Sequence, residues 1–364
     1  MRVLIISHNV FSATESMGKT LSGYFADFEP NQLAQFYIHS QVPTTSKCSN
    51  YYRMTDKEAI KSIVGVSCGT VFGLSDVQPE RDSSRTDRGV TAAIYQKARK
   101  RTPAIYIARN LWWKLSHWDT KRFRDWLDTF DPECVFFASG DYGFMYDISW
   151  KIAKVRNIPL YIVCMDDYYF YNKNQDSMLG RWQHKLFMKS VERAVAYSSK
   201  LFCICDKMTE DYATIFQKPC VTIHTPASIE KQLAFEKKTK ISYLGNLGLK
   251  IMGESLAVIH TESFDEKTRQ SVRYSVSTKI ADSLASGTCI FAYGPEEIAS
   301  IDYLNRANAA VCCTNKDDLA QKLKALITDA QLRDTVIHNA LNLAARNHAK
   351  SCTPEIIKRE LQEQ

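Results

Sequence analysis

The sequence has no run of apolar residues long enough to cross a membrane. A spanning helix needs about 18 or more consecutive apolar residues. The stretch from Met1 to Ser7 reads as a short apolar strand without a cleavable signal pattern. We therefore expect a cytoplasmic protein, with peripheral contact to the inner face of the membrane as an open alternative.

Patterns that bind metals or form disulfides are also absent. The eleven cysteines include no C-x-x-C pair, and no histidines stand at H-x-x-x-H spacing, so the usual zinc arrangements are missing. Most cysteines lie within apolar runs, which predicts reduced thiols in the core. Gly18-Lys19-Thr20 is similar to the end of a P-loop, but Ala13 stands where that motif has a glycine, which excludes it. We expect neither a metal nor a cofactor.

Neither sign of charge dominates the composition. The net charge of +7 fits phosphate substrates or an anionic surface without selecting between them. With 364 residues, of which 45% are hydrophobic, the chain can bury more than one core. Two domains are therefore expected.

The most informative stretch is residues 271–294, which predicts a loop, a short helix, a glycine stop and a buried strand. Ser277 and Thr278 suit the start of the helix, because a hydroxyl oxygen can accept a hydrogen bond from an unpaired backbone N–H there. Gly287 suits a left-handed helix end. Residues 289–293 form the short apolar run of the strand.

The start of this helix combines features that suit a phosphate group. A helix N-terminus carries partial positive charge and unpaired N–H groups, and Lys279 adds a cation. Asp282, one turn further along, could accept hydrogen bonds from a ribose diol. The alternative is an ordinary amphipathic helix whose polar face is solvated.

The residues S-T-K-I-A-D-S-L-A-S-G, followed by an apolar strand and Gly-Pro, resemble the nucleotide-sugar segment of the GT-B glycosyltransferases. The likeness is to the large retaining family called family 4, whose pattern is P-[ST]-K-x-x-E-x-L-A-x-G-x-P-V-[IL]. Three positions depart from it. Ser277 and Cys289 replace prolines, and Asp282 replaces the glutamate that contacts the ribose in the family.

The resemblance implies an α/β protein of GT-B architecture, in which two Rossmann-like domains with parallel sheets face each other across a cleft. It implies a hexosyltransferase that uses a nucleoside diphosphate sugar, retains the anomeric configuration and requires no metal. The donor site that it implies consists of Gly245, Asn246, Ser277, Thr278, Lys279 and Asp282. Gly18 would approach the acceptor in the cleft.

The same resemblance implies the domain bounds. Residues 1–225 would form the acceptor domain and residues 226–240 the linker. The nucleotide-sugar domain would cover residues 241–351, and residues 352–364 would form a helix that crosses back. This second domain is short for half of a GT-B protein, and a gap of about 50–70 residues is expected at Lys250/Ile251, a few strand–helix units of about 30 residues each.

Carboxylates follow two predicted strands. Asp166 and Asp167 come directly after the strand at residues 160–164, and ligands of open α/β sheets bind beyond the carboxyl ends of strands. Asp166 is our candidate acceptor-side base or orienting group, and Asp167 a candidate cleft residue; the alternative for both is turn formation. Glu262 follows a predicted strand at residues 256–260 and is a candidate contact to a sugar hydroxyl.

Basic residues and tryptophans alternate between Lys97 and Trp126. This mixture suits a membrane interface or a lipid-linked acceptor, and it could also stack on and neutralise RNA. The third possibility is a pair of surface helices whose tryptophans pack inward. The candidates for a membrane or acceptor surface are Arg101, Arg109, Trp112 and Trp113.

The sequence thus favours a glycosyltransferase that uses a nucleoside diphosphate sugar, with a lipid-linked saccharide of surface polysaccharide assembly as a possible acceptor. Two alternatives stay open. One is a nucleotide-sugar epimerase of the same fold, and the other is a non-catalytic module that binds membranes or RNA.

Overall fold

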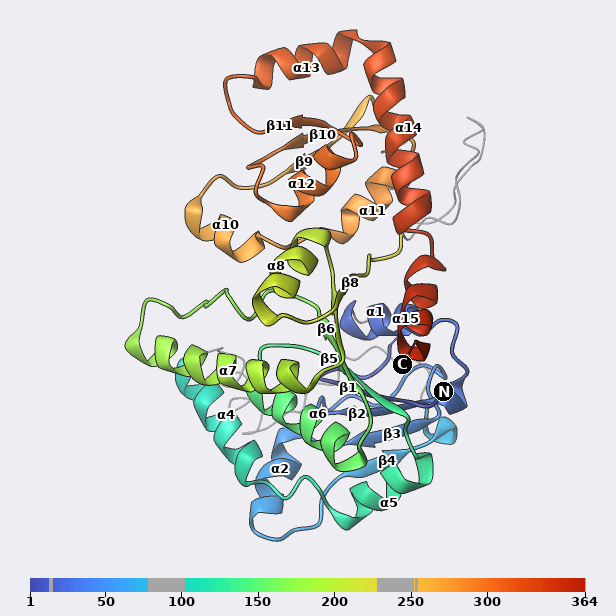
Figure 1. The fold of residues 1–364 in the computed structure, drawn as a ribbon, viewed down its shortest axis with the longest axis vertical. Coiled ribbons are helices and arrows are strands. Elements are labelled where there is room, and N and C mark those ends of the chain that lie inside the picture. The colour runs from blue at the N-terminus through green and yellow to red at the C-terminus, as the bar shows by residue number, and fades with distance from the viewer. Residues whose placement is uncertain (13–15, 78–101, 228–251, 253–254, 364) are drawn as a thin grey trace, which may run out of the picture. The chain divides into compact units, whose positions relative to one another are not determined.

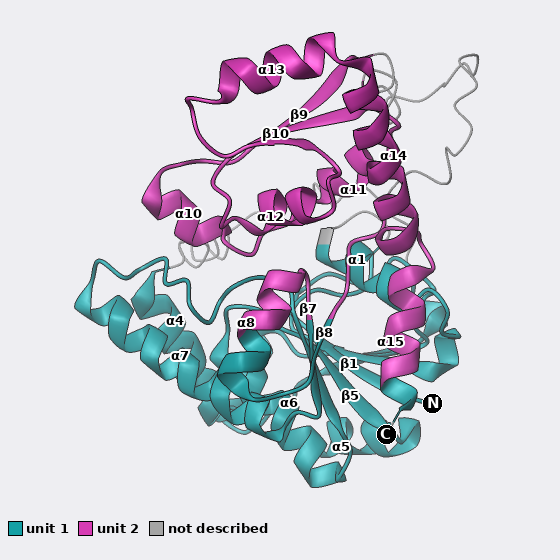
Figure 2. Ribbon diagram, turned by 45° about the horizontal axis from the view of Figure 1, so that its top comes forward, with its two compact units in different colours: residues 1–202, 212–221, 361–364 teal, residues 203–211, 222–360 magenta. Residues whose placement is uncertain are grey.

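The computed structural model describes residues 1–12, 16–77, 102–227, 252 and 255–363. The chain divides into two compact units, coloured separately in Figure 2. Unit 1 comprises Met1–Phe202, Tyr212–Val221 and Leu361–Gln364, and unit 2 comprises Cys203–Asp211 and Thr222–Glu360. The expected α/β class is confirmed, whereas the domain bounds inferred from the sequence stay a prediction.

Unit 1 is built on an eight-stranded sheet in the order β4-β3-β2-β1-β5-β6-β7-β8 (Figure 1). β1 pairs in parallel with β2 on one side and β5 on the other, and β3 and β4 pair in the antiparallel sense. The strands are β1 Val3–Ser7, β2 Leu33–Tyr37, β3 Asn50–Arg53, β4 Thr70–Phe72, β5 Cys134–Ala138, β6 Leu160–Cys164, β7 Lys200–Cys203 and β8 Cys220–Thr222. The chain therefore starts in the middle of the sheet and builds first one side and then the other, so the order reverses between β1 and β5.

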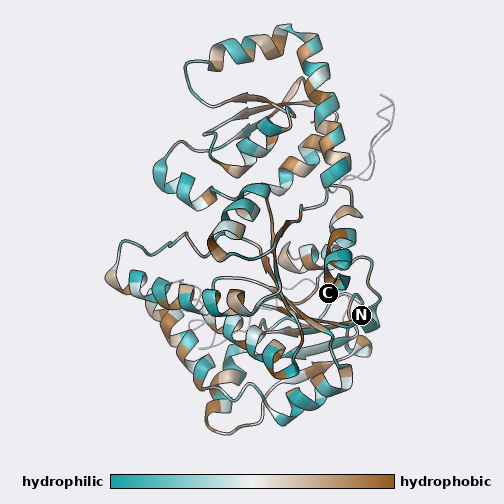
Figure 3. Cartoon of the chain, viewed as in Figure 1, coloured by the Kyte–Doolittle hydropathy of each residue, from teal (hydrophilic) through white to brown (hydrophobic). Residues whose placement is uncertain are grey.

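The central strands are apolar throughout because helices cover both faces of the sheet. All residues of β1, β2, β5 and β6 are buried, as expected for parallel strands in the middle of a sheet. Figure 3 shows this as brown strands beneath helices with teal outer faces. The helices are α1 Ser16–Tyr24, α2 Asp56–Ile63, α4 Pro103–Leu115, α5 Lys121–Phe130, α6 Gly143–Arg156 and α7 Met178–Tyr197. Helix α8, Asp206–Phe216, begins in unit 2 and ends in unit 1.

Unit 2 contains a three-stranded parallel sheet in the order β11-β10-β9 within the described residues. The strands are β9 Ala257–Thr261, β10 Cys289–Tyr293 and β11 Val311–Cys313. The helices are α10 Glu266–Val272, α11 Thr278–Ala285, α12 Ala299–Arg306, α13 Leu319–Thr328, α14 Ala330–Asn347 and α15 Cys352–Gln362. The expected gap at Lys250/Ile251 lies outside the described residues.

Cysteine and tryptophan are distributed unevenly. All eleven cysteines fall in the described part of the chain, where nine are buried and none is paired. All six tryptophans belong to unit 1: Trp112, Trp113, Trp118, Trp126, Trp150 and Trp182. Within the part of the chain that the structure describes, no helix combines the length and apolar character needed to cross a membrane.

Candidate functional site

Helix α11 has the local structure that its sequence predicts. Ser277 is the N-cap, and its side chain accepts a hydrogen bond from the backbone N–H of Lys279 at 3.3 Å. Ile280 and Leu284 are buried in the core of unit 2. Gly287 has a φ of +70°, the left-handed conformation that glycine adopts without strain, and β10 follows directly.

The polar side of α11 lies where strand ends gather. Because α11 leads into β10, which is parallel to β9, its first turn lies at the sheet edge where both strands end. Thr278 and Lys279 are exposed there, and Asp282 is half-buried. Asp282 lies close enough to His348 for its charge to act on that ring. The arrangement provides N–H groups, a cation and a carboxylate within one helical turn of each other.

The cap of α11 can be tested separately from any ligand. We expect Ser277→Ala to lower the free energy of unfolding by about 1 kcal/mol, because the first turn loses a side-chain acceptor for a backbone N–H. Ser277→Asp should keep the full stability, since aspartate caps as well as serine and its charge suits the helix N-terminus. Calorimetric unfolding of the three proteins measures both effects, and an equal loss in the two variants would contradict the capping role.

Glu262 follows β9 and is held at the same sheet edge by a compact hydrogen-bond cluster. Its Oε1 accepts a hydrogen bond from Ser300 Oγ at 2.9 Å and lies 3.2 Å from His260 Nε2. The Ser300 hydroxyl is also 3.1 Å from His260 Nε2, and Ser300 is fully buried. Gly294 leaves the necessary space, because a Cβ there would stand 2.7 Å from the Glu262 Cβ.

This cluster favours the ionised form of Glu262. Burial alone would raise the pKa of the carboxyl, but hydrogen bonds from His260 and Ser300, together with the His260 charge, outweigh it and hold the pKa below its ordinary value. A fixed carboxylate of this kind suits the acceptance of hydrogen bonds from hydroxyl groups. The sequence indicated Glu262 but not its two partners, His260 and Ser300. His260 and Glu262 are two positions apart, so their side chains lie on the same face of an extended chain.

The two aspartates after β6 have different environments. Asp167 is buried, and its Oδ1 accepts hydrogen bonds from Tyr212 Oη and the Phe170 N–H, both at 3.1 Å. This is the turn-forming role left open by the sequence. Asp166 is exposed, and its Oδ1 accepts the Asp167 N–H at 2.9 Å. Of the two aspartates, Asp166 is therefore the one that is exposed to solvent at the sheet edge.

A cluster that the sequence did not reveal lies at the edge between β1 and β5, where the strand order reverses. His8 directly follows β1, and its ring is stacked on Tyr142 with centroids 5.5 Å apart. His39, just after β2, lies 5.6 Å from His8. Burial, and next the positive charge of Arg109, lower the pKa of His8 to about 4. A neutral imidazole thus lies at the place where doubly wound sheets bind ligands.

Gly18 is buried at the start of α1 and has a structural reason to be glycine. A Cβ at this position would stand 2.4 Å from the Val10 carbonyl oxygen, so the helix and the loop after β1 could not approach as they do. Its expected contact with an acceptor stays a prediction. Gly245, Asn246 and Arg101 lie outside the described residues.

The surface expected from the basic and tryptophan-rich stretch is corrected by the structure. Arg109 and Trp113 are 9% and 1% exposed, so they face the interior of unit 1. Asp56 Oδ1 accepts hydrogen bonds from Arg109 Nε at 3.0 Å and from Trp113 Nε1 at 2.7 Å. Trp112 is half-buried. The inward-packing alternative therefore holds for Trp113 and Arg109, because their helix faces α2 and α6 rather than solvent.

Metal ligands do not gather in the described ranges: there, no group of three or more His, Cys, Asp or Glu side chains could hold an ion. Unit 2 therefore offers one set of candidate residues, the α11 N-terminus and the Glu262 cluster. Unit 1 offers another, the His8 cluster and Asp166.

Comparisons with known proteins show the fold. No family model and no curated protein matched the sequence. Sucrose-phosphate synthase from Thermosynechococcus elongatus is 8% identical with a TM-score of 0.57, covering 100% of this chain and 98% of its own. Anabaena HepE in complex with UDP and glucose is 9% identical with a TM-score of 0.54, covering 100% of both chains.

A third solved structure gives the same result. The E. coli trehalose-6-phosphate structure bound with UDP-2-fluoro glucose is 9% identical with a TM-score of 0.53, and the match covers 100% of this chain and 99% of that chain. These neighbours are GT-B glycosyltransferases. The chain therefore has the GT-B fold implied by its sequence, and identities this low carry the fold alone.

Proposed function

We propose that this protein transfers a sugar from a nucleoside diphosphate sugar to an acceptor. The observation that carries the proposal is the first turn of α11. Its exposed polar residues, with Asp282 one turn further, lie at the sheet edge where the Glu262 carboxylate is also held. The GT-B fold supports the proposal, since solved proteins of this fold hold UDP and UDP-2-fluoro glucose.

The residues of unit 2 take distinct roles in this proposal. The α11 N-terminus and Lys279 stabilise the charge that develops on the departing diphosphate. Asp282 accepts hydrogen bonds from the ribose, and Glu262 accepts them from hydroxyl groups of the sugar. Gly245 and Asn246 complete the diphosphate contact through their backbone. We further propose retention at the anomeric carbon, transfer of a hexose, and no required metal, as the resemblance implies.

The acceptor belongs to unit 1 in this proposal. Asp166 is exposed at the carboxyl end of β6 and takes the role of orienting group or base. His8 is a second candidate for orienting an acceptor hydroxyl, because burial keeps its ring neutral and so able to accept a hydrogen bond. A lipid-linked saccharide of surface polysaccharide assembly is the acceptor that we propose, with the protein at the inner face of the membrane.

Calorimetric unfolding with added nucleotides tests this proposal and shows which nucleotide binds. We expect one of UDP, GDP, ADP and CMP, most readily UDP, to raise the calorimetric melting temperature by a few degrees. A ligand at about 100 times its dissociation constant adds about 2.7 kcal/mol. Lys279→Ala/Asp282→Ala should lose this rise, because a phosphate cation and a ribose acceptor are both removed.

Two further variants separate binding from folding. Lys316→Ala/Asp317→Ala removes the same charges from an exposed loop of unit 2 and should keep the rise. Ser277→Asp should fold normally yet lose the rise, because its carboxylate repels the diphosphate. If no nucleotide raises the melting temperature of the parent protein, the proposal fails and a non-catalytic binding module becomes the better reading.

A further inference from the structure

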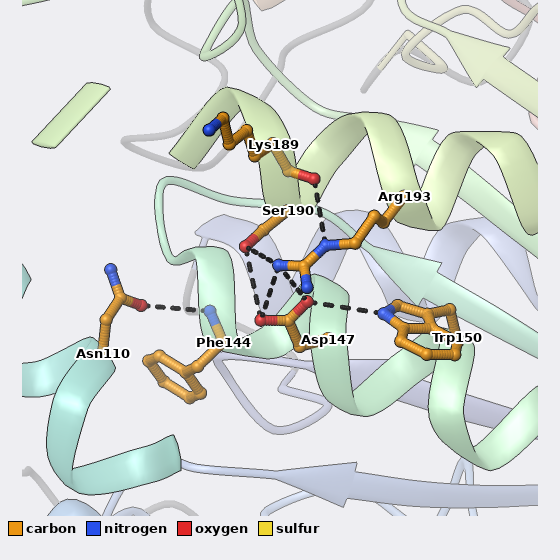
Figure 4. Close-up of polar contacts among 7 residues, drawn as sticks. All are labelled: Asn110, Phe144, Asp147, Trp150, Lys189, Ser190 and Arg193. Atoms are coloured by element: carbon orange, nitrogen blue, oxygen red, sulfur yellow. Dashed lines mark hydrogen bonds and ion pairs between the residues drawn. The ribbon is translucent and has the colours of Figure 1, made fainter. Parts of the chain in front are cut away.

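A groove of about 830 Å³ lies on unit 1, away from the residues assigned above. Its walls are α4, which contributes Leu111, and α7, which contributes Trp182 and Leu186. Phe144 and Asp147 of α6 also line it, and Figure 4 labels both side chains. The volume falls in the range of small-ligand sites, about 300–1,000 Å³.

The walls present large apolar side chains to solvent. Leu111, Trp182 and Leu186 are 56%, 51% and 40% exposed. The same helices extend this surface, because Leu115, Met178 and Leu179 are also exposed. Residues 178, 182 and 186 recur every four positions and so form one stripe along α7. Contiguous exposed apolar surface of this kind marks a binding site for an apolar partner.

Two charged side chains of the groove, Asp147 and Arg193, pair with each other. The Asp147 side chain is 11% exposed, and its Oδ1 lies 3.1 Å from Arg193 Nη2. The same carboxylate accepts hydrogen bonds from Ser190 Oγ at 3.3 Å and Trp150 Nε1 at 3.4 Å (Figure 4). The charge of Arg193 is therefore matched by Asp147, and neither presents an unpaired charge to a ligand.

The rim carries cations that have no such match. Lys114 of α4 and Lys189 of α7 line the groove and are exposed, and Lys185 stands one turn before Lys189. Across the described residues, no carboxylate lies within ion-pair distance of these three lysines. The other acid of the groove, Glu192, accepts a hydrogen bond from Tyr169 Oη at 2.8 Å. The groove therefore combines apolar walls with two exposed lysines that have no ion-pair partner within the described part of the chain.

We propose that this groove binds the hydrocarbon chain of an anionic membrane lipid, whose phosphate meets Lys114 and Lys189. An amphiphile matches both features, since lysine stems pack on apolar surface while their heads meet the phosphate. An apolar segment of a protein partner in the groove would fill its interior but would pair these lysines only if it also carried acidic residues. Lipid binding does not depend on the proposed sugar transfer.

Vesicle sedimentation of the full chain tests the proposal. With vesicles of phosphatidylglycerol and phosphatidylcholine, the parent protein should pellet. Lys114→Gln/Lys189→Gln should bind about 25-fold more weakly, at about fivefold for each lysine, and the difference should disappear on pure phosphatidylcholine or at high salt. Leu111→Ser/Leu186→Ser should weaken binding at least about tenfold on both kinds of vesicle.

The matched control is Ile327→Ser/Lys324→Gln, which makes the same kinds of change on exposed α13 of unit 2 and should bind as the parent does. Brominated acyl chains should quench the fluorescence of Trp182, and Trp182→Phe should abolish that part of the quenching. The nucleotide-induced rise in melting temperature should be the same in every groove variant, so its absence would concern sugar transfer and not this site.

Three outcomes overturn the lipid site. The first is that no vesicle retains the parent protein, which leaves a protein partner as the occupant. The groove variants and the α13 control could lose binding equally, which removes the groove from the interaction. Competition by millimolar inorganic phosphate with no dependence on Leu111 and Leu186 would reduce the site to a simple anion site.

Discussion

Replacing Asp56 with alanine is expected to lower the free energy of unfolding of unit 1 by about 3 kcal/mol. Asp56 Oδ1 accepts hydrogen bonds from both Arg109 Nε and Trp113 Nε1. Arg109 is 9% exposed and Trp113 is 1% exposed, so the change leaves a buried cation and a buried indole N–H without their acceptor. Removal of one partner of a buried ion pair usually costs about 3–5 kcal/mol. The lower value is expected here because the Asp56 side chain is 36% exposed.

Tryptophan fluorescence during urea unfolding measures this effect. All six tryptophans belong to unit 1, so the signal follows that unit even if unit 2 unfolds separately. Asp125→Ala, which breaks an exposed pair with Lys121 on α5, is the control and should cost less than about 1 kcal/mol. Arg109→Met/Asp56→Ala should recover part of the loss, because the buried charge is gone. Equal effects of Asp56→Ala and Asp125→Ala would contradict the buried pair.

Acid is expected to destabilise unit 1 through His8. Burial and the Arg109 charge lower the pKa of His8 from 6.5 to about 4. As pH falls below 6.5, the unfolded chain binds a proton at this position while the folded chain does not. The stability contributed by the neutral ring is therefore complete above pH 6.5 and is lost progressively down to about pH 4. The full loss is roughly 3 kcal/mol, at 1.36 kcal/mol for each pH unit.

The slope of stability against pH identifies His8 as the source. We follow the unfolding free energy by tryptophan fluorescence between pH 6.5 and 4. In His8→Gln its fall with decreasing pH should be smaller than in the parent by the contribution of His8. His39 also acts on His8 in the same direction as Arg109, whereas Asp56 opposes them. An unchanged slope in His8→Gln would refute the assignment.

Local signals in the sequence predicted the elements that local physics determines. The serine cap, the apolar pair one turn apart and the glycine stop predicted α11 and β10 because each signal lies within a few residues of the bond that it makes. The continuous apolar runs predicted β1, β5 and β6 for the same reason, since central parallel strands are buried on both faces.

The contacts that the sequence did not reveal join residues far apart in the chain. Ser300 and Glu262 are 38 positions apart, and Trp113 and Asp56 are 57 apart. The pattern of tryptophans and cations on α4 is the same whether its face meets lipid or another helix, so only the packing of α2 and α6 against it distinguishes the two. The His8 cluster likewise requires β1, β2 and β5 to be neighbours, which no single stretch encodes.

The order of strands has a consequence for synthesis on the ribosome. β1 is translated first and can pair with β2 soon afterwards, yet its other edge waits for β5 at Cys134–Ala138. Until then, the nascent chain presents an unpaired edge whose residues are all apolar or small. Such edges are templates for pairing with other chains. Slow translation between β4 and β5 should therefore increase the need for chaperones more than slow translation after β6.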